Sequence, residues 1–492
     1  MLKEGVALHS HSRVSLTDRF TNHLKSNWPG IVGAKVLLAV SGGADSTAMF
    51  HLMLEASNVL DFEMAVAHFD HALRGEESRR DALFVQELAK SKGLPFYLGM
   101  ADVRLHAQRE SLTLQEAARE LRYKFLFETA SKIEAPFIAT AHTADDQAEE
   151  VLMRLVRGTS MAGLSGIPAN RDSIFRPLLP FTKEELLGFL VQRDLAFVQD
   201  SSNEKECYLR NRVRKKLIPA IKKGFNPSIV DTLCRTAELL NEEHQFLDRL
   251  ALKLLERALV ERKASELAVL LVEEFKRSDP VLRRRAFVHL LSDWPQTKRL
   301  ILREHLEALN RLVDGDAPVS SSEVVLPAGL IARRSYDMLV LARYTYWDQF
   351  ENECYKIEVH GPGQFDLPAT LGRVTISLCE RPASFEHTSI PKVLWVSAQK
   401  ARFPWMLRTR QRGDTFWPLN RSGHRRLKKF LIGKKVSKYA RKSLPLIAEG
   451  DEIVAIAGLE VNHLYKVGKN EKKVLRIEWL DCPMWVYGNF LR

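Results

Sequence analysis

The hydrophobic residues in the first half of the chain fall in short runs that alternate with amphipathic segments. Four apolar runs are typical of buried parallel strands: residues 35–40, 63–69, 95–99 and 136–141. Apolar residues at three- and four-residue spacing predict helices in the segments that follow: 46–55, 76–92, 112–131 and 143–157. This alternation predicts a doubly wound, mostly parallel α/β sheet, in which ligands bind beyond the carboxyl ends of the strands.

The hydrophobic pattern changes after residue 221. A segment at 222–228 (KKGFNPS) is predicted to be a linker, and residues 229 to about 312 are predicted to be mostly helical. A strand-like stretch follows at 323–344, and the chain is β-rich from about residue 345. We therefore expect three domains: an α/β domain over 1–221 with an N-terminal extension at 1–33, a mostly helical middle domain over 222–345, and a small basic α+β domain over 346–492.

Composition narrows the class of protein. The 492 residues are too many for one core, and the formal net charge of +12 favours a polyanionic partner. The five cysteines are scattered and form no C-x-x-C pair, which argues against a disulfide framework or a thiolate zinc site and suits a reducing cytoplasm. The pattern contains neither a signal peptide nor a run of about 18 apolar residues. We expect a cytoplasmic protein without a membrane span.

A glycine-rich loop follows the first predicted strand directly and precedes the first helix: Ser41-Gly42-Gly43-Ala44-Asp45-Ser46. Adjacent glycines allow positive φ and a close approach of the backbone to a ligand. The N–H groups of the loop and of the helix N-terminus then form an anion cradle, to which Ser41 and Ser46 add hydroxyl groups. Asp45 would repel a phosphate there unless Mg²⁺ bridged them. The alternative is a structural turn in which Asp45 and Ser46 cap the helix.

Polar clusters also follow the second and fourth predicted strands. Strand alternation places His68 and Asp70 on one face at the same rim as the glycine loop, although a polar strand end would explain them equally well. After the fourth strand, Thr143 and Asp146 have the spacing of a capping box, which does not account for the other acids of ADDQAEE. We expect Asp146 to hold the Mg²⁺ of an ATP complex together with Asp45, and His142 to contact the nucleotide or transfer a proton.

Basic residues form three further groups. Arg119 and Arg122 share a helix face and are suited to stabilise phosphate charge, or alternatively to face solvent beside glutamates. Residues 208–223 hold seven Lys or Arg and no acid, with Asp200 or Asn203 as candidate cap; contact with RNA or phosphate is favoured over a solvated helix. Residues 401–442 hold fourteen Lys or Arg against one acid, interleaved with aromatic residues: Trp405, Phe416, Trp417 and Tyr439. Some of these aromatics must be core, and a basic face for tRNA is predicted.

The SGGADS loop resembles the PP-loop of the N-type ATP pyrophosphatases. Taken together, the motifs resemble those of the tRNA(Ile)-lysidine synthetases. The resemblance rests on SGGADS (41–46), HFDHALRGEESRRD (68–81), EAARELRY (116–123), AHTADDQAEEVLMRLVRGTSMAGLSGIP (141–168), RPLL (176–179), DSSN (200–203), RNRVRKKLIP (210–219), LRTRQRGDTFWP (407–418), RLKKFLIGKKVSKYAR (426–441) and GDEIVAIAGLEVN (450–462). It covers most of the chain and is weakest over 1–30 and about 230–390.

The resemblance implies a two-step reaction on isoleucine tRNA with a CAU anticodon. ATP adenylates the C2 carbonyl oxygen of the wobble cytidine, and the ε-amine of free L-lysine then attacks C2, which changes codon reading from AUG to AUA. It implies that Ser41 to Ser46 bind ATP and that Asp45 and Asp146 hold Mg²⁺. Arg122 and His142 would contact the intermediate, and Arg212 the adenylate or the RNA. We expect His68 and Asp70 to belong to the nucleotide site, and a monomer or homodimer.

Three other functions remain open. A PP-loop tRNA thiolase would be expected to use a thiolate, but no cysteine precedes Cys207. A small-molecule amidating or NAD-type synthetase would leave the basic C-terminal segment unexplained. An RNA-binding protein with an inactive nucleotide fold would not need an intact glycine loop and acid cluster.

Overall fold

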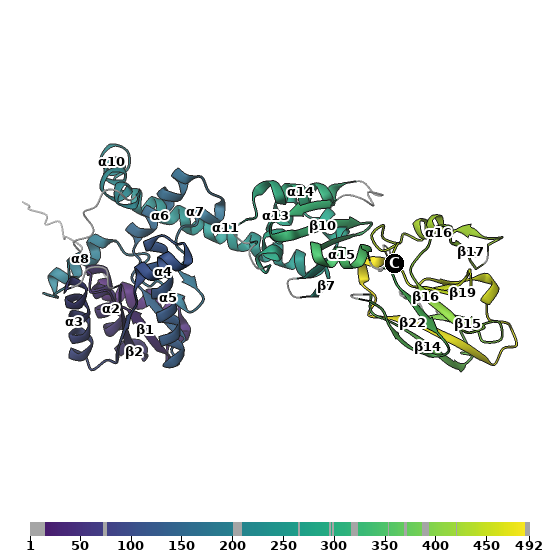
Figure 1. The fold of residues 1–492 in the computed structure, drawn as a ribbon. Coiled ribbons are helices and arrows are strands. Elements are labelled where there is room, and N and C mark those ends of the chain that lie inside the picture. The colour runs from purple at the N-terminus through teal and green to yellow at the C-terminus, as the bar shows by residue number, and fades with distance from the viewer. Residues whose placement is uncertain are drawn as a thin grey trace, which may run out of the picture. The chain divides into compact units, whose positions relative to one another are not determined.

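The computed structural model describes most of the chain. Its described residues are 15–71, 76–199, 209–263, 266–294, 297, 300–315, 323–352, 354–368, 371–385, 393–419 and 421–487. The chain divides into two compact units, residues 1–245 and 246–492 (Figure 1). In the described residues no helix is both long and apolar enough to cross a membrane.

The first unit is built on a six-stranded sheet in the order β3-β2-β1-β4-β6-β5, in which only β5 runs antiparallel to its neighbour. Its strands are β1 (Lys35–Ala39), β2 (Glu63–Asp70), β3 (Phe96–Met100), β4 (Phe137–Thr140), β5 (Asn170–Arg171) and β6 (Ile174–Phe175). The four predicted strands are confirmed. Because β2 and β4 both pair with β1, the connections reverse direction beside β1, and the loops after β1 and β4 become neighbours at a topological switch point.

Helices cover both faces of this sheet. They are α1 (Leu16–Asn27), α2 (Ala44–Leu60), α3 (Glu76–Ser91), α4 (Val103–Glu110), α5 (Leu114–Lys132), α6 (Ala144–Arg157), α7 (Met161–Leu164) and α8 (Lys183–Gln192). Apolar residues of α1, α2, α3 and α8 pack with Val36 and Leu38 on one face, and α5 packs with Leu37 on the other. The predicted doubly wound sheet is thereby confirmed. Of the predicted N-terminal extension, α1 belongs to this core, and residues 1–14 lie outside the described residues.

The basic segment after residue 208 is one helical run that packs against α6. It consists of α9 (Leu209–Arg212), the π-helical turn η3 (Val213–Leu217) and α10 (Ile218–Gly224). Val213 and Ile218 are buried against Ala144 and Ala148 of α6. This packing fixes which side chains of the basic run face the end of β4. The candidate caps Asp200 and Asn203 lie outside the described residues.

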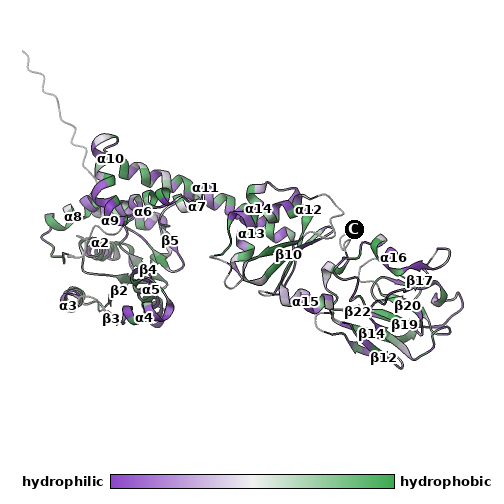
Figure 2. Cartoon of the chain, turned by 45° about the horizontal axis from the view of Figure 1, so that its top comes forward, coloured by the Kyte–Doolittle hydropathy of each residue, from purple (hydrophilic) through white to green (hydrophobic). Residues whose placement is uncertain are grey.

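The second unit begins with a sheet that was not fully predicted. Helix α11 (Ile229–Ala258) leads into a five-stranded sheet in the order β7-β8-β11-β10-β9, covered by further helices. Its elements are β7 (Leu259–Lys263), β8 (Leu267–Leu271), α12 (Val272–Lys276), α13 (Pro280–Ser292), α14 (Arg303–Asp314), β9 (Glu323–Leu326), β10 (Leu330–Ser335) and β11 (Met338–Arg343). Figure 2 shows the alternating hydrophobic and hydrophilic bands along α11 that its sequence spacing predicts.

The helical prediction is wrong for residues 259–263 and 267–271, because these residues form β7 and β8. Strand β8 is a short, fully apolar run that pairs with β11, and such a run cannot be distinguished from a buried helix by periodicity alone. The predicted boundary at residue 345 falls within α15 (Tyr344–Asn352). Trp347 and Phe350 of this helix belong to a core shared by β8, β10, β11 and the C-terminal strands. The division into three domains stays a prediction.

The C-terminal part is β-rich, as predicted. Its elements are β12 (Lys356–Val359), β13 (Gly363–Asp366), β14 (Arg373–Glu380), β15 (Leu394–Ser397), β16 (Trp405–Arg408), β17 (Thr415–Phe416), β18 (Arg425–Arg426), α16 (Leu427–Gly433), β19 (Leu446–Glu449), β20 (Glu452–Ile456), β21 (Glu460–Val461) and β22 (Lys473–Leu480). Two main antiparallel sheets form, β12-β16-β19-β20-β21 and β13-β14-β22-β15, beside the hairpin β17–β18.

Candidate active site

The glycine loop after β1 leaves the N-terminus of α2 open to a ligand. Gly42 has φ +92°, a backbone conformation that residues with a side chain rarely adopt, so this position requires glycine. Gly43 has φ −68°, so only one of the two glycines needs the left-handed region. Gly43 is the N-cap of α2, and no described side chain caps the helix. The free N–H groups can therefore bind an anion.

The hydroxyl groups of the loop hold its shape. Ser46 Oγ donates to Gly43 O at 3.0 Å, lies 3.1 Å from Ser41 Oγ and accepts from Ser41 N at 3.2 Å. The alternative in which Asp45 and Ser46 cap α2 is wrong, because Ser46 bonds inside the loop and Asp45 lies in the first helical turn, facing Lys183. The loop is thus a preformed turn that leads into the uncapped N-terminus of α2.

A cavity of about 620 Å³ opens at the carboxyl ends of β1, β2 and β4. Eight of the residues predicted for the site line it: Ser41, Gly43, Ser46, His68, Asp70, Arg122, His142 and Asp146. Gly42, Ala44, Asp45 and Arg212 are not among its lining residues. The structure therefore brings the three predicted clusters to one place and leaves Arg212, which is exposed, outside.

Asp146 both caps a helix and contacts cations. The predicted capping box is confirmed: Asp146 Oδ2 accepts from Thr143 N at 3.0 Å and from Thr143 Oγ1 at 3.1 Å. Its other oxygen, Oδ1, lies 3.3 Å from Lys183 Nζ and 3.1 Å from Arg210 Nη2. Capping uses one oxygen only, so the second remains available to a cation.

Glu149, one turn further along α6, holds two arginines of the basic run. Its side chain is 1% exposed, and its carboxylate contacts Arg210 Nε at 2.8 Å and Arg214 Nε at 2.5 Å. Because Arg210 and Arg214 are four residues apart, they share the helix face that meets α6. Arg212 lies between them on another face. The four-residue spacing indicates that the two arginines share a helix face, but the sequence did not show which face of the run meets α6.

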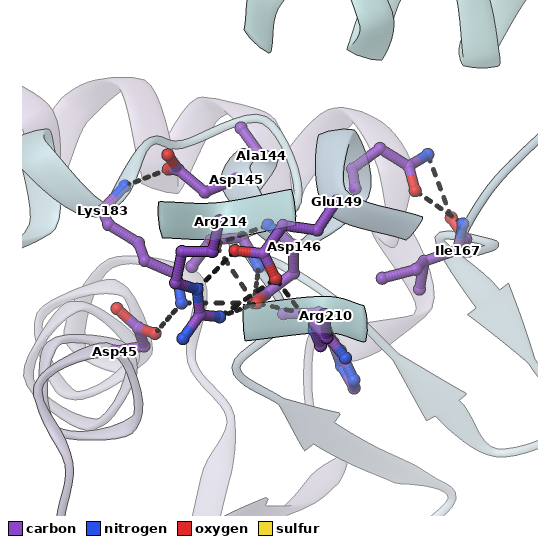
Figure 3. Close-up of polar contacts among 12 residues, drawn as sticks. Asp45, Ala144, Asp145, Asp146, Glu149, Ile167, Lys183, Arg210 and Arg214 are labelled. Atoms are coloured by element: carbon purple, nitrogen blue, oxygen red, sulfur yellow. Dashed lines mark hydrogen bonds and ion pairs between the residues drawn. The ribbon is translucent and has the colours of Figure 1, made fainter. Parts of the chain in front are cut away.

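Sequence reasoning missed Lys183, at the first position of α8. Its Nζ lies 3.2 Å from Asp45 Oδ2 and 3.3 Å from Asp146 Oδ1, between acids that follow two different strands (Figure 3). Its backbone N–H donates to Asp145 Oδ2 at 2.7 Å, and the Thr182–Glu185 capping box sets the start of the helix. The capping box was readable in the sequence. Its position beside the glycine loop was not.

The charges of this cluster, which we call the ion cluster (Asp45, Asp146, Glu149, Lys183, Arg210 and Arg214), shift one another's pKa values. Burial raises the pKa of Asp45, and Lys183 only partly opposes this effect. Burial would also raise the pKa of Asp146, but Lys183 and Arg210 outweigh it and lower the pKa to about 2. Burial lowers the pKa of Lys183, but the two aspartates raise it above its usual value.

Two arginines of α5 also line the cavity. Arg119 and Arg122 both line it, as their shared helix face predicts, and their guanidinium carbons lie 4.8 and 5.4 Å from the Tyr123 ring centroid. Burial, followed by the charge of Arg176, lowers the pKa of His142 to about 3, so this imidazole is neutral at pH 7. Burial also lowers the pKa of His68, whose Nδ1 lies 2.9 Å from Val40 O.

The two acids predicted to hold Mg²⁺ suit that ion. Both carboxylates already converge on one cation, the Lys183 ammonium, and carboxylate oxygens are ligands that Mg²⁺ prefers. The described residues contain no group of three or more His, Cys, Asp or Glu placed to hold a metal. Two carboxylates would therefore have to share the ion with phosphate oxygens and water, which is the usual arrangement for Mg²⁺ bound with a nucleotide.

In the C-terminal part, most of the predicted aromatic residues belong to the core. Trp405 and Phe416 are fully buried and Tyr439 nearly so. Trp417 is half-buried and stacks on His463 with ring centroids 4.8 Å apart. The single acid of residues 401–442, Asp414, forms a buried ion pair with Arg408 at 2.9 Å. The remaining basic side chains are mostly exposed.

Comparison with known proteins identifies both ends of the chain. Residues 14–221 match the family model described as a PP-loop domain, and residues 405–479 match the model described as the TilS substrate C-terminal domain. The PP-loop domain indicates that the chain uses ATP.

Relatives from several bacteria match over nearly the whole length. A tRNA(Ile)-lysidine synthase of Geobacter sulfurreducens is 34% identical, with 90% of this chain and 93% of the relative covered. Proteins of the same name from Dehalococcoides mccartyi (31% identical; 94% and 99% covered) and Caldanaerobacter subterraneus (30%; 90% and 93%) are also similar. The chain belongs to the tRNA(Ile)-lysidine synthase family.

Proposed function

We propose that this chain joins free L-lysine to C2 of the wobble cytidine in isoleucine tRNA with a CAU anticodon, and that the reaction consumes ATP and releases pyrophosphate and AMP. One observation carries the proposal: the glycine loop after β1 and the histidine-acid segment after β4, which holds His142 and Asp146, lie at one cavity that Arg119 and Arg122 of α5 also line. The family membership of the chain supports the same reaction.

In the first step the cytidine O2 attacks the α-phosphorus of ATP, and pyrophosphate leaves. The uncapped N-terminus of α2 suits the phosphates, and Asp45 and Asp146 would hold Mg²⁺, which when bound neutralises phosphate charge. Arg119 and Arg122 bring two positive charges to the wall where the reacting phosphate would develop charge. His68 and Asp70 line the same cavity and would complete the nucleotide site.

In the second step the lysine ε-amine attacks C2, the bond from C2 to the adenylate oxygen breaks, and AMP leaves. The amine must lose a proton on the way. An imidazole with a pKa of about 3 is a weak proton acceptor at neutral pH, so His142 suits a hydrogen bond to the cytidine or the phosphate better than the role of general base.

The basic surfaces would bind the tRNA. Arg210 and Arg214 are engaged with the acids of α6, whereas Arg212 is exposed and would contact RNA rather than the adenylate. The exposed lysines and arginines of residues 401–442 would neutralise backbone phosphates. A cytoplasmic location and a monomeric or homodimeric state remain predictions.

Incorporation of labelled lysine tests the function. With CAU isoleucine tRNA, ATP and Mg²⁺, label should enter the tRNA. Asp45→Asn should lower kcat about a hundredfold or more, because the Mg²⁺ that neutralises phosphate charge loses one of its two carboxylate ligands. Asp61→Asn, at the C-terminal end of the same helix, is the matched control and should keep its activity.

Two results would contradict the proposal. One is full activity of Asp45→Asn, which would separate this acid from the chemistry. The other is ATP-dependent transfer of sulfur instead of lysine to the tRNA, which would indicate a thiolase.

A further inference from the structure

We propose that Lys183 is a resident counter-ion: its ammonium occupies the cation position between Asp45 and Asp146 until a divalent metal arrives with the nucleotide, and then leaves it. This inference deepens the proposed function, on which it rests for the identity of the incoming cation. It assigns a role to a residue that no motif of the sequence singled out.

The geometry places one ammonium where a shared metal would bind. Lys183 Nζ lies 3.2 Å from Asp45 Oδ2 and 3.3 Å from Asp146 Oδ1. The two carboxylates come from the first turns of α2 and α6, which follow adjacent strands, and Figure 3 shows the lysine side chain extending between them. A cation that touches both acids therefore has to take the place of this ammonium.

The backbone of Lys183 is fixed, whereas its side chain can rotate. Its N–H is bonded to Asp145 Oδ2 at 2.7 Å, and the capping box of Thr182 and Glu185 holds the start of α8. The side chain is nevertheless 32% exposed and ends in a compact charge on a flexible four-carbon stem. The ammonium can therefore leave the acids by rotation of the side chain, without movement of the helix.

The charge balance explains why the exchange would be coupled to ATP. Three carboxylates of the ion cluster face three cations, so the formal charges cancel. A free divalent ion in place of the ammonium would leave one excess positive charge beside Arg210 and Arg214, and two while the displaced ammonium stays nearby, which opposes binding. A metal that arrives with a triphosphate brings the negative charge needed to accept both the metal and the displaced ammonium.

Removal of the ammonium should expose the pair of acids to a metal. In Lys183→Met the ion cluster carries a net charge of −1, and Asp45 loses the partner that it contacts in the structure. The nucleotide-free, full-length variant should bind Mn²⁺, used as a paramagnetic probe for Mg²⁺, at least about tenfold more tightly than the original protein. Free Mn²⁺ is counted by its electron paramagnetic resonance signal.

Three further variants locate the effect. Lys183→Arg keeps the positive charge and should bind Mn²⁺ as weakly as the original protein. Lys35→Met removes a lysine that pairs with Glu63 at 3.4 Å, away from the cavity, and should change nothing. The double variant Lys183→Met/Asp45→Asn should lose the gain, because one of the two metal ligands is gone.

Thermal unfolding gives a second readout and reports on folding. A ligand that binds the folded state raises Tm, so 1 mM Mn²⁺ should raise the Tm of Lys183→Met and of Lys183→Gln more than that of the original protein. Unchanged or weaker Mn²⁺ binding in a folded Lys183→Met variant would overturn the inference. The Mn²⁺ measurement contains neither ATP nor tRNA, so its failure would not contradict the proposed lysine incorporation. Conversely, a failure of lysine incorporation would not change the result of the Mn²⁺ measurement.

Discussion

Single residues at the cavity divide their atoms between stability and chemistry. Asp146 uses Oδ2 to cap α6 and presents Oδ1 to cations. Glu149 is almost completely buried, and two guanidinium groups replace its hydration. Capping a helix and forming an ion pair are both ordinary structural roles for an acid. The combination of both roles at the end of β4 is what indicates a functional site there.

His142 makes stability depend on pH. Its pKa falls from 6.5 to about 3 on folding, so below pH 6.5 the unfolded chain binds a proton that the folded chain does not. Folding therefore loses stability as the pH falls from 6.5 towards 3. His142→Gln should remove this pH-dependent loss of unfolding free energy. Between pH 7.5 and pH 5 the original protein should therefore lose about 1–2 kcal/mol more unfolding free energy than the variant loses.

Urea denaturation at pH 7.5, 6 and 5 would measure this change. His360→Gln replaces an exposed histidine of the other unit and should follow the pH dependence of the original protein. The same slope for all three proteins would mean that His142 titrates normally in the folded state.

At the level of elements, α6 organises both the site and the loop that follows it. Its first turn supplies the acids, and its polar side chains hold the segment 158–168. Gln147 Oε1 accepts from Ile167 N at 2.5 Å, and Arg154 Nη1 donates to Gly163 O at 2.8 Å and to Gly166 O at 3.1 Å. The GTSMAGLSGIP motif is thus a turn folded back onto the helix that presents the acids.

Gly166→Ala should disturb this turn. Gly166 has φ +68°, and a Cβ there would clash with the side-chain amide of Gln147. Strain and displacement of the glutamine should together cost about 2 kcal/mol or more of unfolding free energy. Gly188→Ala in α8 is the control: no described atom lies within 4 Å of its Cβ position, so this substitution should stabilise by up to about 1 kcal/mol. Urea denaturation compares the two, and equal effects would show that the turn carries no such constraint.

At the scale of the whole molecule, the distribution of charge matters more for tRNA binding than the net charge does. The net charge of +12 includes a dense basic segment at 401–442, and the ion pair of Asp414 with Arg408 buries the only acid there. Lys428 and Lys429 on α16 are exposed, while Leu427 and Phe430 beside them are buried. The helix therefore packs through its apolar side and presents its lysines to solvent.

Reversal of two of these charges should weaken tRNA binding in a salt-dependent way. Lys428→Glu/Lys429→Glu should raise the Kd for tRNA about tenfold or more and reduce the slope of log K against log [salt] by about 1–2, because phosphate contacts are lost. The pair Lys472→Glu/Lys473→Glu, also adjacent and in the same part of the chain, serves as control. Filter binding at several salt concentrations would measure both, and equal losses in the two variants would indicate an unspecific charge effect.

The local features of the first unit could be predicted because their causes lie within a few residues. Buried runs such as 35–39 and 137–140 form strands, the Thr143–Asp146 capping box starts α6, and the glycine turn at Gly42 and Gly43 leads directly into α2, as their side chains require. Since consecutive parallel strands end at one rim, the sequence also predicted that His68, His142 and Asp146 would lie at the same edge of the sheet, and all three line one cavity.

Contacts between distant segments were decided only by tertiary structure. Residues 267–271 became a strand because β11, far along the chain, offers β8 a hydrogen-bonded partner. Arg210 and Arg214 rather than Arg212 face the acids because Val213 and Ile218 pack on α6 and set the rotation of the basic run. Lys183 entered the ion cluster because α8 starts beside α6. Spacing within a segment reveals what its side chains can do, whereas the packing of segments determines which charges meet, because Coulomb attraction depends on distance in space.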